Sequence, residues 1–262
     1  MLIPKALTIA GSDSGGGAGI QADLKTFSAF RVFGMSVITA VTAQNSVGVQ
    51  GVENLPPPFV ARQLRSVLED LGADAAKCGM LSTAAIIEAI AEVLAEMPIE
   101  KLVVDPVMVA KSGDPLLQPD ARQALIGRIL PLALVVTPNL PEAEALAGIP
   151  VTSREDMEEA ARRIHALGPR HVLVKGGHLK GDAVDLLWNG RELTAYSAPR
   201  VDSSSTHGTG CTFSAAIAAG LSRGCPLPDA VRDAKAYVTR AIREGFKAGR
   251  GVGQLRHFLA EW

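Results

Sequence analysis

The sequence predicts an α/β fold with a mostly parallel central sheet and an antiparallel edge. Short apolar runs alternate with longer segments whose apolar residues recur every three or four positions, which is typical of strands and helices in turn. The composition is 47% hydrophobic but only 4% aromatic, and small aliphatic side chains suit parallel strands covered by helices. Late in the chain, Asn189-Gly190 separates two strand-like runs, and this dipeptide is a strong signal for a β-hairpin.

The individual elements follow in order along the chain. Six apolar runs predict the strands of the parallel sheet, at residues 6–10, 36–41, 73–78, 102–104, 134–136 and 172–174. Amphipathic periodicity predicts helices at residues 21–33, 58–71, 83–95, 119–129 and 154–167. The predicted hairpin comprises 183–188 and 192–196, and two further helices are expected at 211–222 and 228–245. Right-handed crossovers would join the parallel strands into one sheet, so we expect residues 1–262 to form a single domain.

Charge and cysteine content exclude several classes of protein. Lys plus Arg (26) nearly cancel Asp plus Glu (27), so no global field favours nucleic acid or an anionic membrane as a partner. No apolar stretch reaches the ~18 residues that a membrane-spanning helix needs. The three cysteines, Cys78, Cys211 and Cys225, lack CxxC spacing, which argues against a disulfide framework and a zinc site. We therefore expect a cytoplasmic protein.

Polar side chains follow three of the predicted strands. Asp105 follows one strand, Asn139 and Glu142 follow the next, and Lys175 ends another. Ligands of open parallel sheets bind at the carboxyl ends of the strands, so these four side chains are expected together. Two acids, an amide and a lysine suit magnesium and a transferring phosphate. Each also has a structural alternative, because Asn139 and Glu142 could cap a helix and Asp105 could simply end its strand.

A glycine-rich segment at residues 11–19 follows the first strand and enters a helix. It matches neither the Walker A motif nor the dinucleotide-binding fingerprint. It is either a flexible turn or a place where a substrate lies against backbone. Asp23, about one turn inside the helix, is then positioned to face that substrate.

The most specific segment is 202–212, which ends in His207-Gly208-Thr209-Gly210-Cys211-Thr212 and opens an apolar helix. Successive N–H groups at such a helix start form an anion hole, and the same field would favour a thiolate at Cys211. The alternative is an ordinary helix start with a buried structural cysteine. By contrast, Cys78 and Cys225 are interpreted as packing residues, and His165, His171 and His257 as surface or incidental residues.

Together these motifs resemble the bacterial hydroxymethylpyrimidine/phosphomethylpyrimidine kinase family of thiamine biosynthesis, in the ribokinase-like superfamily. The resemblance extends over the whole chain and is carried by residues 10–25, 40–45, 77–81, 105–108, 137–143, 174–178 and 206–212. It implies a ribokinase-like three-layer αβα sandwich. It also implies ATP-dependent phosphorylation of 4-amino-5-hydroxymethyl-2-methylpyrimidine to its monophosphate and then its diphosphate, with ATP and Mg²⁺ as cofactors. Relatives are commonly dimeric, which implies a homodimer.

The resemblance also implies roles for individual residues. It places Gly11, Asp23, Gln44, Met80 and Val107 around the pyrimidine, with Gln44 at the ring edge and Asp23 at the hydroxymethyl group. It places Asp105 and Glu142 at the metal, and Asn139, Lys175, Thr206 and Gly208 at the nucleotide. It gives Cys211, Lys175, Gly208 and Gly210 the catalytic roles, with Cys211 as base or as a member of the anion hole. Many ribokinase relatives carry Asp at the position of Cys211, so a carboxylate base is not implied here.

Three other functions stay open at this point. A pyridoxal or pyridoxine kinase acts on a ring that also bears a hydroxymethyl group. A non-catalytic vitamin-binding sensor would keep the fold, although Lys175, Asp105 and Cys211 speak against it. A cysteine hydrolase would pair Cys211 with His207, but no third orienting residue is evident nearby.

Overall fold

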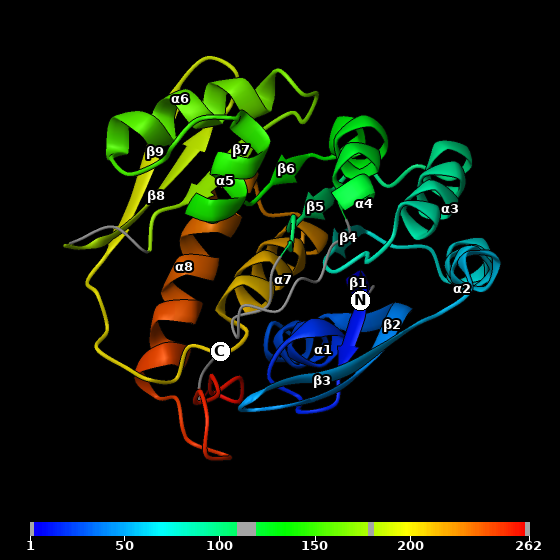
Figure 1. Ribbon diagram of the computed structural model, residues 1–262, viewed down its shortest axis with the longest axis horizontal. Coiled ribbons are helices and arrows are strands. Elements are labelled where there is room, and N and C mark those ends of the chain that lie inside the picture. The colour runs from blue at the N-terminus through cyan, green and yellow to red at the C-terminus, as the bar shows by residue number, and fades with distance from the viewer. Residues whose placement is uncertain (1–2, 109–118, 178–180, 260–262) are drawn as a thin grey trace.

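The computed structural model describes residues 3–108, 119–177 and 181–259 and contains a nine-stranded sheet (Figure 1). The strand order is β3-β2-β1-β4-β5-β6-β7-β8-β9. The strands are β1 (Lys5–Asp13), β2 (Phe33–Asn45), β3 (Gly48–Asn54), β4 (Ala75–Cys78), β5 (Leu102–Val104), β6 (Val135–Val136), β7 (Val172–Lys175), β8 (Ala183–Trp188) and β9 (Leu193–Ala198). From β2 to β7 neighbouring strands are parallel. The carboxyl ends of the central strands therefore meet at one edge, as the sequence predicted.

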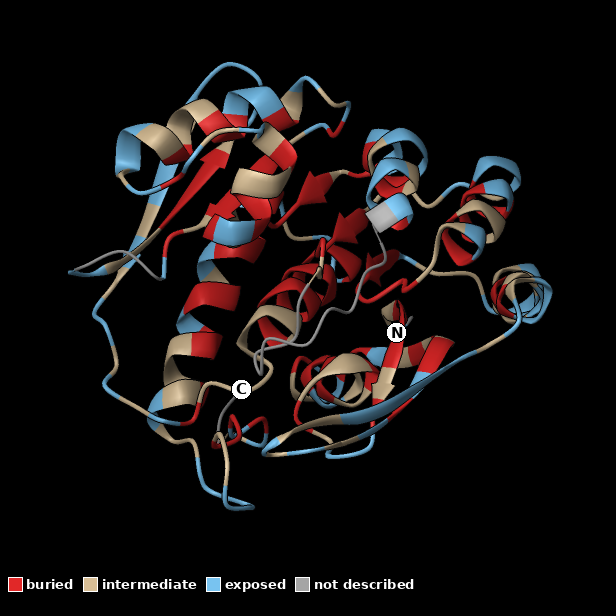
Figure 2. Ribbon diagram, in the orientation of Figure 1, coloured by how far each residue is buried: buried red, intermediate tan, exposed pale blue. Residues whose placement is uncertain are grey.

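Helices cover both faces of the sheet and make three layers (Figure 1). The helices are α1 (Gly19–Ala29), α2 (Pro57–Asp70), α3 (Ala84–Glu96), α4 (Pro119–Ala124), α5 (Leu140–Ala147), α6 (Arg154–His165), α7 (Thr209–Ser222) and α8 (Leu227–Arg243). One hydrophobic core joins one face of the sheet to α2 through α6, and a second core joins the other face to α1, α7 and α8. Figure 2 shows the central strands and most of α7 buried, with the exposed surfaces on the outer sides of the helices.

The antiparallel strands lie at both edges of the sheet, whereas the sequence predicted one such edge. The predicted hairpin is confirmed as β8 and β9, which pair in antiparallel register around Gly190 at φ 89°. Strand β3, at the other edge, was not predicted. Its sequence is GVQGVEN, and none of its side chains is buried, so it carries no apolar alternation that could reveal a strand. Pairing with β2 alone gives it an extended conformation.

Two predicted helices end earlier than periodicity indicated. Helix α1 ends at Ala29, because Arg31 adopts a left-handed φ of 59° and Phe33 already begins β2. The predicted helix over 119–129 is α-helical only to Ala124 and continues as the π-helical turn η1 (Leu125–Ile129), followed by the 3₁₀ turn η2 (Leu130–Leu132). In both cases the apolar pattern runs past the residue at which the backbone changes conformation.

Candidate active site

A cavity of about 770 Å³ lies at the carboxyl ends of the parallel strands. Twelve of the predicted site residues line it, namely Gly11, Gln44, Met80, Asp105, Val107, Asn139, Glu142, Lys175, Thr206, Gly208, Gly210 and Cys211. Asp23 does not line it. These residues come from five strand ends and from the start of α7, so the parallel sheet is what brings them together.

The centre of the cavity is an ion pair between Lys175 and Asp105. Lys175 Nζ donates to Asp105 Oδ1 over 2.7 Å, and Asp105 is only 2% exposed. Thr137 Oγ1 donates to Oδ1 at 3.3 Å, and Ser214 Oγ donates to Oδ2 at 3.4 Å. Burial disfavours the charge on Lys175, but the nearby carboxylates outweigh it and raise the lysine's pKa. Lys175 therefore stays an ammonium, ready to meet an anion.

The start of helix α7 faces this ion pair. Gly208 precedes the helix in a left-handed conformation, with φ 78°. A Cβ on Gly210 would lie 3.4 Å from Lys175 Nζ and 3.5 Å from Asp105 Oδ2, so the first turn of the helix lies directly against the charged pair. N–H groups at a helix start together with an ammonium form an anion site.

Asn139 and Glu142 form a capping box at the start of α5. The Asn139 side chain accepts from Glu142 N at 2.9 Å, and the Glu142 side chain accepts from Asn139 N at 2.8 Å. The structural alternative for these residues is thus confirmed, yet both also line the cavity. Burial raises the pKa of Glu142 to about 7; Lys175 opposes the rise and the charge of Asp105 adds to it.

Asp23 does not face the cavity as expected. Its side chain is fully buried and pairs with Lys77 at 2.8 Å, while Thr8 Oγ1 donates to the same carboxylate oxygen at 2.6 Å. Lys77, and not Asp23, lines the cavity. The expectation failed because helical spacing alone does not show whether a carboxylate meets a ligand or a buried lysine of a neighbouring strand.

Cys211 lies at the predicted place, but its thiol does not behave as predicted. Burial raises its pKa to about 11, and the positive charge of Lys77 only partly offsets that rise. The expectation of a favoured thiolate is therefore wrong. The helix start does not compensate for the loss of hydration of a buried sulfur.

The opposite part of the cavity is formed by Gly11, Gln44 and Met80. A Cβ on Gly11 would lie 3.1 Å from Met80 Sδ, so the thioether lies directly against bare backbone. Thr42 Oγ1 donates to Gln44 Oε1 at 3.1 Å, which orients the carboxamide. A flat, largely apolar wall with one oriented amide suits a small aromatic heterocycle.

Several polar residues of the site escaped the sequence analysis. Lys77 and Lys235 are buried lysines, and Lys235 Nζ donates to Asp185 at 2.6 Å. His257 was expected to be incidental, but it is buried and shares a 2.9 Å hydrogen bond with Thr212 Oγ1. Burial lowers its pKa to about 4. A lysine inside the short apolar run 75–78 was the one visible signal, because charged residues are seldom buried without a partner.

The donor atoms of the cavity fit a magnesium ion shared with phosphates. Asp105 and Glu142 are two neighbouring buried carboxylates, and the rise in the pKa of Glu142 shows that their charges are not fully compensated. Mg²⁺ usually takes one or two carboxylates and completes its shell with water and substrate phosphates. Within residues 3–108, 119–177 and 181–259, no three His, Cys, Asp or Glu side chains form an all-protein metal cluster. None of the helices described there could cross a membrane.

Comparison with known proteins agrees with this site. The phosphomethylpyrimidine kinase family model matches residues 13–256. A hydroxymethylpyrimidine/phosphomethylpyrimidine kinase of Streptomyces coelicolor is 54% identical over 254 residues, which is 97% of this chain and 94% of that protein. The crystal structure of a Clostridium difficile phosphomethylpyrimidine kinase matches with TM-score 0.82 and 48% identity, over 92% of this chain and all of that one.

Pyridoxal kinases are also structurally similar. The Staphylococcus aureus pyridoxal kinase in complex with AMP-PCP and pyridoxal matches with TM-score 0.90 and 40% identity, over 98% of this chain and 94% of that one. The three-layer sandwich with its antiparallel edges is therefore ribokinase-like. Since the family model covers nearly the whole chain and the relatives match along its length, the chain is a kinase that belongs to the phosphomethylpyrimidine kinase family.

Proposed function

We propose that the chain phosphorylates 4-amino-5-hydroxymethyl-2-methylpyrimidine with ATP, first to the monophosphate and then to the diphosphate. One observation carries the proposal: a single cavity joins the Lys175–Asp105 pair and the start of α7 to the wall formed by Gly11 and Met80. A phosphate donor and a flat acceptor ring would meet there. The names of the relatives supply the identity of the ring.

In this reaction the hydroxymethyl oxygen attacks the γ-phosphate in line, and the chain's own groups stabilise the charge that develops. Lys175 lies on the transferring phosphate, and the N–H groups of Gly208, Gly210 and Cys211 form the anion hole. Because the thiol of Cys211 is held protonated near neutral pH, we assign Cys211 to the anion hole and not to proton abstraction. Gln44 orients the ring, with Gly11, Met80 and Val107 around it.

The cofactors fit the remaining polar residues. We place ATP along Asn139, Lys175, Thr206 and Gly208, which line the same cavity. Asp105 and Glu142 would hold Mg²⁺ between them. The ion would neutralise charge on the β- and γ-phosphates. Asp23 is assigned to holding Lys77, with no direct contact to the acceptor.

The test is turnover by the purified protein with ATP and Mg²⁺. We expect ADP release with the hydroxymethylpyrimidine and again with its monophosphate, each product being identified by mass spectrometry. Release with the first acceptor alone would leave a monokinase and contradict the second step. Binding of the pyrimidine without any ADP release would indicate a sensor.

A second candidate is a pyridoxal kinase, which the likeness to the S. aureus enzyme favours. Pyridoxal assayed in parallel with the pyrimidine decides between the two. A kcat/KM for pyridoxal at least tenfold above that for the pyrimidine would overturn our choice of acceptor. The fold and phosphate site would serve either reaction.

We further propose that residues 1–262 act as one domain that forms a homodimer in the cytoplasm, with no nucleic-acid or membrane partner. The β2–β3 edge exposes Phe33, Val41, Val47 and Val52, which are 41–61% exposed, and an apolar edge of this kind favours association. The free thiols Cys78, Cys211 and Cys225 are consistent with a reducing compartment. Light scattering of Val52→Glu would test the dimer, which we expect to dissociate.

A further inference from the structure

The carboxylate of Asp13 shapes the glycine-rich loop of residues 11–19, which we call the acceptor loop. Asp13 Oδ1 accepts from Gly15 N at 2.7 Å, and Oδ2 accepts from Gly17 N at 3.1 Å and from Ala18 N at 2.8 Å. The side chain is 3% exposed and lies at the cavity. Three backbone donors on one carboxylate hold a segment that has little else to order it.

His207 reaches the same carboxylate from residues 206–212, which we call the phosphate loop. Its Nε2 lies 3.0 Å from Asp13 Oδ2, across 194 residues of sequence. Burial would raise the pKa of Asp13, but the hydrogen bonds from His207, Ala18 and Gly15 outweigh it and hold the pKa below its ordinary value. An ionised carboxylate only accepts hydrogen bonds, so His207 Nε2 carries the donated hydrogen.

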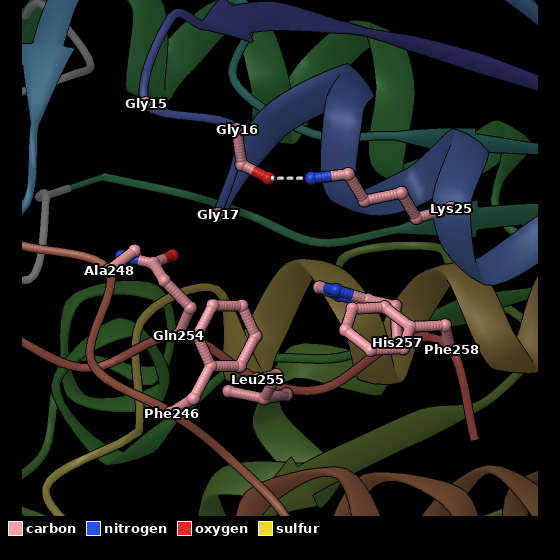
Figure 3. A pocket seen from close by; sticks show the side chains of 10 residues that line it. All are labelled: Gly15, Gly16, Gly17, Lys25, Phe246, Ala248, Gln254, Leu255, His257 and Phe258. Carbon is pink, nitrogen blue, oxygen red and sulfur yellow. Dashed lines mark hydrogen bonds between the residues drawn. The ribbon is translucent and has the colours of Figure 1, made fainter.

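The backbones of the two loops are also in direct contact. Gly208 has φ 78°, and a Cβ at this position would collide with the carbonyl oxygen of Gly17. A Cβ on Gly17 would in turn collide with the side chains of His207 and Gln254. Figure 3 shows Gly15, Gly16 and Gly17 beside the C-terminal segment that carries Gln254 and His257, and all five line a small cavity of about 120 Å³. Neither loop can shift far without moving the other.

Resting on the proposed function, we infer that Asp13 and His207 form a clamp that couples nucleotide binding at the phosphate loop to the shape of the acceptor loop. His207 is a positioning residue: it touches no reacting atom, and acts through Asp13 on the amides of Gly15, Gly17 and Ala18. Coupling between two binding sites is reciprocal. An acceptor in the acceptor loop therefore also tightens the binding of nucleotide.

Amide hydrogen exchange of peptides covering residues 11–19 tests the clamp without requiring any acceptor. In the wild type, Mg²⁺ with AMP-PCP is expected to slow exchange in this segment severalfold. His207→Leu removes the donor and is expected to abolish the slowing, while His207→Gln, whose amide can still donate to Asp13, retains part of it. Lys25→Met is the matched control, because Lys25 Nζ donates to Gly16 O at 2.6 Å in the same loop but is not bonded to the phosphate loop (Figure 3).

Calorimetry gives the second readout. The affinity for hydroxymethylpyrimidine is measured with and without Mg²⁺ and AMP-PCP. We expect a ratio of about tenfold in the wild type, falling to about onefold to twofold in His207→Leu and in Asp13→Asn, with no further loss in the double variant because both substitutions break one contact. Thermal melts confirm that each variant is folded.

The outcomes separate the inference from the proposed function. If nucleotide and pyrimidine bind but exchange in 11–19 ignores nucleotide, or if His207→Leu keeps the wild-type ratio, the clamp is overturned. If Lys25→Met loses the slowing as fully as His207→Leu, the effect is general loosening of the loop and the clamp is likewise overturned. If nucleotide does not bind at all, the kinase function fails and the clamp fails with it. If nucleotide slows exchange but the pyrimidine does not bind, only the choice of acceptor is contradicted.

Discussion

Lys77 and Asp23 form an ion pair of 2.8 Å in which both side chains are fully buried. Lys77 comes from the middle of the sheet and Asp23 from α1. Removing two charges from water costs several kcal/mol per ion, and a pair of this kind contributes little to stability compared with apolar residues of similar size. Its position at the cavity, beside Cys211, indicates that it is retained for the charge that it places there.

Breaking this pair from one side is expected to be costly. Lys77→Met leaves the Asp23 carboxylate buried without its partner, and should lower the free energy of unfolding by about 3–5 kcal/mol. The double variant Asp23→Leu/Lys77→Met removes both charges and should recover most of that loss. Urea denaturation of the single and double variants measures both values. A single variant as stable as the wild type would show that the pair is not truly desolvated.

Lys175 should act on turnover more than on acceptor binding. Lys175→Ala removes the ammonium beside Asp105 and is expected to lower kcat by about 10²–10³, the usual cost of losing a preorganised charge at a transfer site. The Kd of the pyrimidine should change by less than about threefold. Lys101→Ala is a suitable control, because Lys101 Nζ donates only to Leu221 O, at 3.0 Å. An equal loss of pyrimidine affinity would place Lys175 on the acceptor.

Cys211 should tolerate loss of its thiol. Burial holds the thiol protonated below about pH 11, and its backbone N–H is kept in Cys211→Ser and Cys211→Ala. Both variants are expected to keep kcat within about tenfold of the wild type, a smaller loss than the ~10²–10⁴ expected for a missing general base. The profile of kcat against pH between 6 and 9 should also be unchanged. A loss of 10³-fold or more in both variants would restore the thiolate base.

His257 should make the protein less stable in acid. Its pKa in the folded protein is lowered to about 4 by burial, against ~6.5 in an unfolded chain. Between these values the unfolded state binds more protons, so the free energy of unfolding falls as the pH drops from about 6.5 to 4, by at most about 3 kcal/mol.

Denaturant melts of the wild type and His257→Gln at several pH values isolate this contribution. The variant should lack that part of the pH dependence, and the difference in stability between the two proteins should shrink as the pH falls. His165→Gln, on the opposite face of the sheet in α6, controls for the loss of an imidazole elsewhere. A difference that is constant with pH would show that His257 is solvated in the folded state.

The sequence by itself determined the parallel core of the fold and most of the lining of the site. Apolar runs such as 102–104 and 172–174 need no tertiary context to indicate buried strands, and the polar residues that follow them must meet once those strands are parallel. The residues 206–212 likewise carry the signal of an anion-binding helix start in their own spacing.

Only the tertiary structure decided which charges face each other. Asp23 turned to Lys77, His207 to Asp13 and His257 to Thr212, and each contact joins segments far apart in the chain. The pKa of the Cys211 thiol depended on burial, which no local pattern contains. Strand β3 depended on pairing with β2, since its exposed side chains show no apolar alternation. Local sequence sets backbone conformation and periodicity, whereas the protonation and partners of buried polar groups are set by the segments that pack around them.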